Sequence, residues 1–435
     1  MPGYRAVRGW AAMDHPGLPK LDLVVIGNGM AGLRVIEELL EVAPERYNIT
    51  VFGAEPHASY NRIMLSPVLA GDKAFEEIQT HDRDWYAERG ITLYTGEAVA
   101  DIDRRRRMVI SDSGREVGYD RLVLATGSRP FIIPVPGHDL DGVISFREIG
   151  DVDRMVEASA NGGRAVVIGG GLLGLEAAYG LHRRGMDVTI VHLMSQLMER
   201  QLDPTAAQLL QHSLAQRGLS FRMGAETAAI TGDENGRVTG LRFKDADDST
   251  LDADLVVMAV GIRPNIDLAK AAGLYCDRGI VVNDTMQSYD PRIYAVGECV
   301  EHRGAVYGLV APLWDQARVC ANHLAWRGHT QYGGSVTATQ LKVTGIDMYS
   351  AGDFADAEDT EALTFTDIRR GVYKRIVLRN NRIAGLVLYG DTRDGAWYFK
   401  HLQAGTDVSA FRDRLLFGRA FVEAGAQGRS QEAAA

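Results

Sequence analysis

Two glycine-rich segments of this chain carry the pattern Gly-x-Gly-x-x-Gly, whose backbone can cradle a phosphate group. They occupy positions 27–32 and 169–174. In such a loop the first glycine permits a tight turn, the second lets the backbone approach a pyrophosphate, and the third lets a helix pack closely on a strand. One such loop is weak evidence. Two loops predict two dinucleotides held by one chain, and the simplest use of two is to pass electrons between them.

The first loop stands between elements that suit a nucleotide site. A buried strand is expected at 21–26, a helix over about 30–42, and a second strand at 49–52. The helix N-terminus would face the phosphates, and Glu55 lies just past the second strand, where an acid accepts hydrogen bonds from ribose hydroxyls. This order favours a nucleotide site over an ordinary glycine turn. The candidate residues are Gly27, Asn28, Gly29, Met30, Ala31, Gly32 and Glu55.

The second loop has the same surroundings but lacks the acid. Strands are expected at 164–168 and 187–191, and His192 follows the second of them. An acid at that place would favour NADH and nearby arginines would favour NADPH, so a histidine leaves the coenzyme preference open. Glu176, on the expected helix at about 175–184, either faces solvent or turns toward the nicotinamide amide. The candidate residues are Gly169, Gly171, Leu172, Gly174, Glu176, His192 and Gly261.

Between the loops, Arg62 follows Glu55 closely, which favours a cofactor contact over a surface charge. Strands at 98–103 and 107–110 predict an antiparallel excursion. The arginine run at 104–107 is interpreted as a solvated turn rather than as a site for an anionic partner. A further buried strand at 119–127 ends in glycine.

The composition narrows the class of protein. The chain has 435 residues, which suggests two to four domains, and its apolar share of 46% and charged share of 24% are typical of soluble globular proteins. The net charge of -10 argues against nucleic acid as the main partner. No apolar run approaches the roughly 18 residues of a membrane span. The first 20 residues lack the apolar stretch of a secretory signal, and we expect a disordered extension there, with Met13 as an alternative start.

The three cysteines, Cys276, Cys299 and Cys320, form no Cys-x-x-Cys pair. An iron–sulfur cluster, a zinc site and a redox-active dithiol are therefore not expected, and no metal ligand is assigned. This cysteine usage fits a reducing, cytoplasmic setting.

Taken together, the residues resemble the two-dinucleotide flavoprotein reductases of the glutathione-reductase fold type. The resemblance is carried, in order, by the first loop with Glu55, the strand at 122–127, the second loop, and the late segment at 293–298. It implies an α/β fold with two Rossmann-like dinucleotide-binding domains and a small α+β C-terminal domain. It also implies FAD at the first loop and NADH or NADPH at the second. The late acid, which binds the flavin ribityl chain in the family, is usually aspartate and here is Glu298.

Within that superfamily the chain resembles the FAD/NAD(P)H module of assimilatory nitrite reductase large subunits and nitrate-reductase electron-transfer subunits. The segments that carry this are 60–66, 197–203, 295–304 and 340–347, and the resemblance runs from about 21 to 418. His192 is ordinary within this subgroup. Pro67 stands where NADH oxidases have a flavin-adjacent cysteine and ferredoxin reductases often have a lysine, so cysteine-based redox chemistry is disfavoured. The [2Fe–2S] and sirohaem segments of full nitrite reductases are absent from this sequence, and we expect it not to reduce nitrite alone.

The resemblance also implies further cofactor contacts and a domain plan. The added contact residues are Asn61, Arg62, Val99, Ala125, Thr126, Gly127, Gly297, Glu298, Leu313 and Trp314. The expected domains are an FAD-binding domain at 21–140 and 266–328, an NAD(P)H-binding domain at 141–265, and a C-terminal interface domain at 329–420, followed by a disordered tail at 421–435. In that last domain strands are expected at 372–378 and 382–390 around an Asn380-Asn381 turn, with helices at 395–402 and 409–417. Core packing is favoured for its aromatic run at 397–399.

The sequence thus predicts an FAD-dependent NAD(P)H oxidoreductase that passes electrons to a separate iron–sulfur or haem partner, in a nitrite or nitrate assimilation system. No side-chain acid or base is required for the hydride step, so no residue is assigned as catalytic, and Glu176, Arg62 and Glu298 would act by positioning. A homodimer is compatible with the C-terminal domain. The alternatives are a rubredoxin or ferredoxin reductase, an NADH oxidase, and a nucleotide-binding sensor without turnover.

Overall fold

The computed structural model describes residues 19–326, 328, 330–341 and 345–424, so most of the expected N-terminal extension and C-terminal tail lies outside the described residues. The chain forms two compact units. The first is built from the chain up to Asn61 together with Gln79–Arg129 and Arg263–Ser335, and the second from Arg62–Ile78, Pro130–Ile262 and the chain from Val336 onward. Strands β8 (Ser128–Pro130) and β17 (Ile262–Pro264) pair as a two-stranded sheet. The domain plan expected from the sequence remains a prediction.

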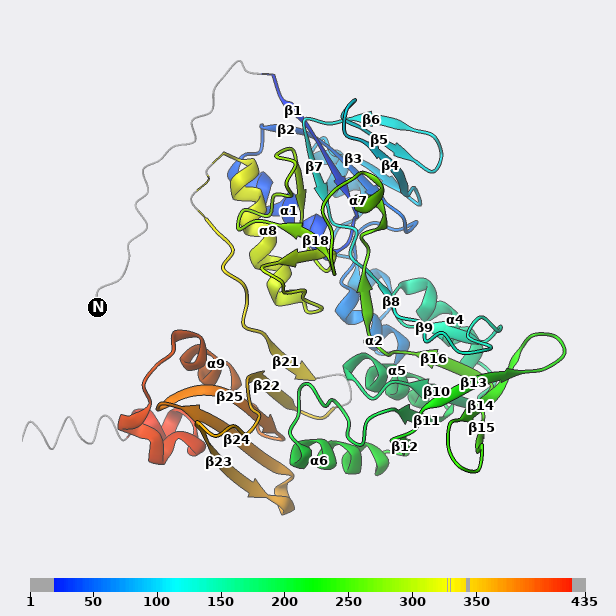
Figure 1. Cartoon of the computed structure of the whole chain (residues 1–435), viewed down its shortest axis with the longest axis vertical. Helices are drawn as coiled ribbons and strands as arrows, with labels where there is room; N and C mark the ends of the chain where they lie inside the picture. Colours follow the sequence, from blue (N-terminus) through cyan, green and yellow to red (C-terminus); the bar gives the residue numbers. More distant parts are fainter. Residues whose placement is uncertain (1–18, 327, 329, 342–344, 425–435) are drawn as a thin grey trace, which may run out of the picture. The chain divides into compact units, whose positions relative to one another are not determined.

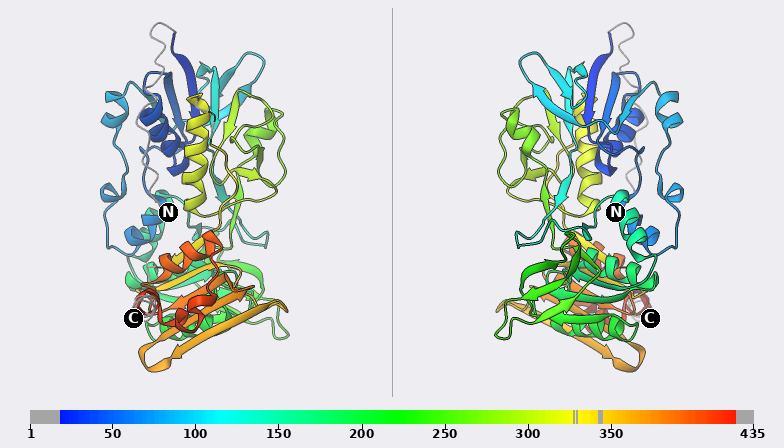
Figure 2. Two further views of the ribbon diagram at one scale, coloured as in Figure 1. Left: turned by 90° about the vertical axis from the view of Figure 1, so that its left-hand side faces the viewer. Right: turned by 90° about the vertical axis from the view of Figure 1, so that its right-hand side faces the viewer.

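The first unit is organised by a parallel five-stranded sheet with the order β19-β7-β1-β2-β3. Its strands are β1 (Leu21–Ile26), β2 (Tyr47–Gly53), β3 (Thr92–Thr95), β7 (Arg121–Leu124) and β19 (Ile293–Ala295). Buried apolar residues run almost without interruption along β1, as expected for a strand covered on both faces. Helix α1 (Met30–Val42) begins and ends where the sequence predicts, and α8 (Val310–Leu324) packs beside it (Figures 1 and 2).

Smaller elements surround this sheet. They are α3 (Arg83–Glu88), β4 (Val99–Asp103), β5 (Met108–Ser111), β6 (Glu116–Gly118), α7 (Asp267–Ala271), β18 (Ile280–Val282) and β20 (Val300–His302). The antiparallel pairing of β4 with β5 confirms the predicted excursion.

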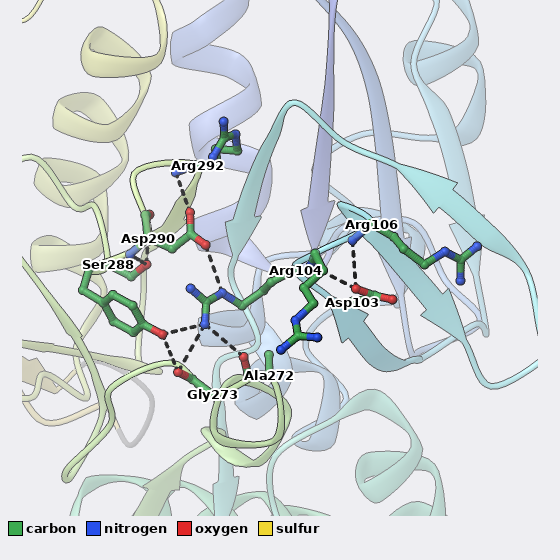
Figure 3. A network of polar contacts seen from close by, with 10 residues as sticks. Asp103, Arg104, Arg106, Ala272, Gly273, Ser288, Asp290 and Arg292 are labelled. Carbon is green, nitrogen blue, oxygen red and sulfur yellow. Dashed lines mark hydrogen bonds and ion pairs between the residues drawn. The ribbon is translucent and has the colours of Figure 1, made fainter.

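The arginine run between β4 and β5 corrects one interpretation. Arg104 is not a solvated charge, because its Nε lies 2.9 Å from Oδ2 of Asp290 and its NH1 lies 2.5 Å from the Tyr289 hydroxyl (Figure 3). The same guanidinium group reaches the carbonyl oxygens of Ala272 and Gly273 at 3.4 Å. Since Arg104 fastens the hairpin to a segment far along the chain, the solvated-turn interpretation is wrong for this residue.

The second unit repeats the parallel design with a five-stranded sheet in the order β12-β11-β10-β16-β9. Its strands are β9 (Val143–Ser145), β10 (Arg164–Ile168), β11 (Asp187–His192), β12 (Ser220–Met223) and β16 (Leu255–Met258). An antiparallel sheet of β13 (Thr227–Gly232), β14 (Val238–Phe243) and β15 (Thr250–Asp252) adjoins it in sequence. The remaining elements of this part are η1 (Arg62–Met64), α2 (Leu65–Leu69), η2 (Glu76–Ile78), α4 (Ile149–Ser159), α5 (Leu172–Arg183) and α6 (Pro204–Ala215).

The C-terminal part of the second unit is an antiparallel sheet with the order β21-β22-β25-β24-β23. Its elements are β21 (Ala338–Leu341), β22 (Met348–Gly352), β23 (Thr360–Asp367), η3 (Ile368–Arg370), β24 (Val372–Arg379), β25 (Arg382–Tyr389), α9 (Gly395–Ala404) and η4 (Ser409–Phe417). Asn380 and Asn381 have φ values of 51° and 56°, which confirms the predicted tight turn. The final helix is a 3₁₀-helix interrupted at Phe411.

The aromatic run of α9 packs as predicted. Tyr398 is fully buried in the core of the C-terminal sheet, and Trp397 and Phe399 pack against that core. Within the described residues, no helix is both long and apolar enough to cross a membrane.

Candidate dinucleotide sites

The first glycine loop has the geometry of an open phosphate cradle. Gly27 has a φ of +111°, and a Cβ there would lie 2.1 Å from the carbonyl oxygen of Ala125. A Cβ on Gly32 would lie 2.1 Å from the carbonyl oxygen of Gly27, whereas a Cβ on Gly29 would meet nothing within 4 Å. Gly29 is the N-cap of α1 and makes no side-chain hydrogen bond, so no capping side chain occupies the first amides of the helix. These amides and the helix dipole suit an anion.

The second loop repeats this geometry closely. Gly169 has a φ of +124°, and a Cβ there would lie 2.3 Å from the carbonyl oxygen of Ala259. A Cβ on Gly174 would lie 2.0 Å from the carbonyl oxygen of Gly169. Gly171 has open space around it and caps α5 without a side-chain hydrogen bond. Because Gly171 is the N-cap, α5 begins at Leu172, before the expected position. Both loops therefore fit a pyrophosphate.

Two side chains near the first loop support a nucleotide there. The Tyr60 hydroxyl donates to Oε2 of Glu55 at 2.6 Å, which orients the predicted ribose acid. The Tyr86 hydroxyl donates to Oδ1 of Asn28 at 2.8 Å, while the buried Nδ2 of Asn28 has no partner within the described part of the chain. Leaving a buried donor unpaired costs about 1–3 kcal/mol. An acceptor from a bound dinucleotide would remove that cost, so the residues present fit the group.

The predicted segment Ala125-Thr126-Gly127 is held by a residue that the sequence reasoning missed. The Thr126 hydroxyl donates to the carbonyl oxygen of Asn265 at 2.8 Å, and Nδ2 of Asn265 donates to the carbonyl oxygen of Thr126 at 2.9 Å. The backbone N–H of Asn265 also donates to the carbonyl oxygen of Gly127. The only sequence signal for Asn265 is its place after the Arg263-Pro264 pair that ends β17.

The late acid is also held by neighbours in the first unit. The Ser128 hydroxyl donates to Oε2 of Glu298 at 2.7 Å. The backbone N–H of Gly297, which has a φ of +92°, donates to Oε1 of the fully buried Gln316 at 2.8 Å. Gln316 was missed because a polar residue in the middle of α8 gives no motif.

The remaining predicted contacts lie on several elements. Leu313 is buried in α8, and Trp314 is half-buried with the guanidinium of Arg34 at 5.8 Å from its ring centre. Val99 starts β4, and Asn61 ends the first segment of the first unit. Arg62 belongs to the second unit, where its NH1 donates to the carbonyl oxygen of Arg147 at 3.1 Å and lies 3.9 Å from the Glu148 carboxylate. The cofactor contacts of these residues stay predictions.

Glu176 lies on α5, near α2. The Ser66 hydroxyl donates to Oε2 of Glu176 at 2.7 Å. Burial raises the pKa of the Glu176 carboxyl to about 7, and the bond from Ser66 offsets part of that shift. The group can therefore accept or donate a proton near neutral pH. Pro67 follows Ser66 within α2. Gly261 has a φ of +110°, and a Cβ at this position would meet no atom within 4 Å.

His192 ends β11 and is nine-tenths buried. Its Nδ1 accepts the backbone N–H of Gly170 at 3.1 Å, and its Nε2 lies 3.1 Å from Oε2 of Glu199. The predicted site residue is thus joined to the loop itself, and Glu199 was missed because it lies in a turn that carries no strand or helix signal.

The cysteines do not form a reactive pair. Cys299 and Cys320 are fully buried, and burial raises the pKa of both thiols. Burial also raises the pKa of the half-buried Cys276. In the part of the chain that the structure describes, no group of three or more histidine, cysteine or acidic side chains could hold a metal ion.

Comparison with known proteins identifies the family. The model of the pyridine nucleotide-disulphide oxidoreductases matches residues 21–322, and that of the rubredoxin NAD+ reductase C-terminal domain matches residues 338–406. This chain belongs to the pyridine nucleotide-disulphide oxidoreductase family. It is an NAD(P)H oxidoreductase with FAD and a nicotinamide dinucleotide as its two nucleotides, which confirms the predicted fold class, enzyme class and cofactors.

Two curated relatives and two solved structures are informative. The chain is 53% identical to nitrite reductase [NAD(P)H] of Bacillus subtilis (90% of this chain and 48% of the relative). It is 46% identical to the assimilatory nitrate reductase electron transfer subunit of that organism (92% and 51%). The chain therefore spans about half the length of these relatives.

Among solved structures, the chain resembles the reductase of a covalent putidaredoxin reductase–putidaredoxin complex, with a TM-score of 0.79, 28% identity, and coverage of 89% and 93%. It also resembles NADH:rubredoxin oxidoreductase from Clostridium acetobutylicum, with a TM-score of 0.74, 26% identity, and coverage of 90% and 97%. The names of both neighbours include a second protein, putidaredoxin in one and rubredoxin in the other.

Proposed function

We propose that this chain takes electrons from NAD(P)H by way of FAD and delivers them to a separate redox protein of a nitrite or nitrate assimilation system. The observation that carries this is the pair of matched glycine loops in a chain that has proline at position 67. Two dinucleotide sites without a redox-active cysteine leave the flavin as the exit for electrons. The names of the two Bacillus subtilis relatives support the assimilation system.

In the proposed mechanism the first unit holds the resident cofactor. FAD, when bound, supplies a ring that accepts a hydride from a nicotinamide and can release electrons one at a time. The open backbone at Gly29 would face the pyrophosphate, Glu55 would accept from ribose hydroxyls, and Glu298 would accept from the ribityl chain. Tyr60 and Ser128 orient these two carboxylates through the hydrogen bonds described above.

The second unit would bind and release the nicotinamide coenzyme. Gly171 offers its open backbone to the pyrophosphate, and Glu176 would orient the nicotinamide carboxamide. With a pKa of about 7, Glu176 can donate to the carboxamide oxygen when neutral or accept from its NH₂ group when ionised. Neither role moves a proton in the reaction, so these residues act by positioning.

A specific observation favours a second candidate acceptor. The C-terminal residues 338–406 match the rubredoxin NAD+ reductase C-terminal domain, and one similar solved structure is an NADH:rubredoxin oxidoreductase. Rubredoxin or a ferredoxin would then replace the nitrite or nitrate enzyme as the partner. A homodimer and a cytoplasmic location remain predictions of the sequence.

The test starts from purified protein reconstituted with FAD under anaerobic conditions. NADH or NADPH should bleach the flavin absorbance, and reoxidation should then be measured separately with a nitrite reductase sirohaem module, rubredoxin, ferredoxin and dioxygen. Fast reoxidation by the nitrite reductase module supports the proposal, and fast reoxidation by rubredoxin or ferredoxin supports the second candidate. If neither coenzyme bleaches the flavin, or if dioxygen is the best acceptor, the proposal is wrong.

A further inference from the structure

The unexplained feature of the second loop is the histidine at the place of the ribose acid. A histidine there could be a plain packing residue, but His192 uses both ring nitrogens. Because Nδ1 accepts the N–H of Gly170, the ring hydrogen is on Nε2 and points to the carboxylate of Glu199. The ring therefore connects the second loop to an acid seven positions further along the chain.

The turn that carries Glu199 is built against the same glycine. The backbone N–H of Met198 donates to the carbonyl oxygen of Gly170 at 3.0 Å, and both Leu197 and Met198 are buried. A Cβ on Gly170 would lie 2.8 Å from the His192 ring and 2.8 Å from Leu197. Met198 adopts a φ of +49°, a strained backbone conformation for a residue other than glycine. Packing and hydrogen bonds thus fix where the next residue, Glu199, leaves the turn.

The carboxylate of Glu199 has an oxygen that can accept a hydrogen bond from a ligand. Its side chain is one-third exposed, and among the described residues nothing holds its second oxygen. Leu193 and Met194, which directly follow His192, are exposed apolar side chains that offer a surface for an adenine ring. An acid that His192 connects to a pyrophosphate loop, with exposed apolar residues directly after that histidine in the chain, suits the ribose and adenine of a dinucleotide.

We propose that Glu199, oriented by His192, is the residue that selects NADH over NADPH. Its free oxygen accepts a hydrogen bond from the ribose 2′-hydroxyl of NADH. The 2′-phosphate of NADPH would instead bring negative charge against a carboxylate whose position is already set, and it would be repelled. This inference deepens the proposed function and rests on the second loop binding the nicotinamide coenzyme.

Arg200 is the competing feature, because a free arginine beside the ribose would favour NADPH. Within the described residues Arg200 makes no hydrogen bond or ion pair, so nothing orients its guanidinium toward the loop. Glu199 needs no further ordering to act, whereas Arg200 would lose side-chain entropy on binding. The anchored acid therefore decides the preference.

The direct test measures binding without hydride transfer. Isothermal titration calorimetry of the FAD-loaded protein with ADP-ribose and with its 2′-phosphate should give at least tenfold tighter binding of ADP-ribose. Glu199→Gln should reduce the ratio of the two affinities about tenfold. His192→Ala should reduce the same ratio similarly, because the ring that orients the Glu199 carboxylate is then missing. The double variant should show little further loss. Glu226→Gln, at an exposed ion pair with Lys244 in the same unit, is the matched control and should leave the ratio unchanged.

A rescue variant guards against simple misfolding. His192→Asp in the Glu199→Gln background places an acid at the strand end, and it should restore the preference for ADP-ribose. The parallel readout is the ratio of kcat/KM for flavin reduction by NADH and NADPH. The inference is overturned if Glu199→Gln leaves both ratios unchanged, or if Arg200→Gln increases the NADH preference. A protein that binds ADP-ribose selectively but is not reduced by either coenzyme would instead sink the proposed function and leave this inference standing.

Discussion

The two glycine loops agree where the backbone is crowded and differ where a side chain can be chosen. In each loop the first and last glycines leave no room for a Cβ, and the middle one is open. The position after the first glycine differs, because Asn28 carries a side chain whereas Gly170 is pressed against His192. The packing of the helix on the strand therefore requires glycine at the crowded positions of both loops. We attribute the differences between the loops at the other positions to their different ligands.

The acids after the second strands extend this comparison. Glu55, the predicted ribose acid of the first site, is oriented by a tyrosine five positions later. In the second loop the His192 ring accepts the N–H of Gly170 and lies within hydrogen-bond distance of Glu199, the acid that we propose for the second site. A resident cofactor stays bound, whereas a coenzyme must be released after each reaction. We therefore expect FAD to bind more tightly than the nicotinamide coenzyme.

The largest expected effect comes from Gly32→Ala in the first loop. Its methyl group would lie 2.1 Å from the carbonyl oxygen of Gly27, so α1 must move away from the strand. Overpacking of this kind costs about 1–3 kcal/mol, which should lower the melting temperature of the FAD-free protein by several degrees and prevent FAD retention. Gly29→Ala is the control, since open space surrounds that position. It should keep the melting temperature and lose only FAD affinity, and equal melting temperatures for the two variants would contradict the packing argument.

Gly170→Ala tests the difference between the loops. A methyl group there would lie 2.8 Å from the His192 ring, so the ring and the Glu199 turn must shift. We expect about tenfold weaker binding of ADP-ribose with FAD content unchanged, measured by calorimetry and absorbance. Asn28→Ala at the matching position of the first loop should cost only about 1 kcal/mol, from the lost bond to Tyr86. The clash should also lower the melting temperature, and adding His192→Ala to Gly170→Ala should restore part of it, since Leu197 also lies 2.8 Å from the added methyl group. No recovery would argue that the His192 ring is not the obstacle.

Glu176→Gln tests the titration on α5. Burial raises the pKa of the folded carboxyl to about 7, above its ordinary value of 4.5. Between these values the folded chain keeps a proton that the unfolded chain has lost, so the group lowers stability progressively as the pH rises from about 4.5 to about 7. The variant should therefore gain a few degrees in melting temperature over the parent by pH 7.5, and little at pH 4.5. Thermal unfolding scans across this pH range would measure the difference in melting temperature between the variant and the parent. A difference that stays constant would show that Glu176 does not titrate there.

The smallest expected effect is that of Tyr60→Phe. It removes the 2.6 Å hydrogen bond to Glu55 and leaves the ring in place. The expected loss is about 1 kcal/mol, or about fivefold in FAD affinity, measured by FAD titration of the apoprotein. NADH binding at the second loop should be unchanged. A loss of more than a hundredfold would mean that Tyr60 does more than orient the acid.

Most of the fold follows from local signals in the sequence. The glycine loops, the helix at 30–42 and the Asn380-Asn381 turn were predictable because each depends on backbone preferences of neighbouring residues. The same is true of the parallel sheets, since short apolar strands alternate with helices along the chain.

The supporting residues of the site were not predictable in this way. Asn265 binds Thr126 across 139 positions, and Arg104 binds Asp290 across 186 positions. Gln316 supports Gly297 from inside an otherwise apolar helix face. These residues become neighbours only in the tertiary structure. The sequence alone does not distinguish a polar residue that faces solvent from one that completes a buried hydrogen-bond network. For this reason Arg104 was wrongly interpreted as part of a solvated turn.

The buried thiols give the protein a chemical robustness of its own. Thiolates are the form of cysteine that peroxide oxidises, and burial raises the pKa of Cys276, Cys299 and Cys320. A flavin reductase works beside a source of reduced oxygen species, which would damage an exposed, ionised thiol first. Because Cys299 and Cys320 are fully buried and the pKa of all three thiols is raised, we expect peroxide to oxidise the cysteines of this chain slowly, and the half-buried Cys276 first.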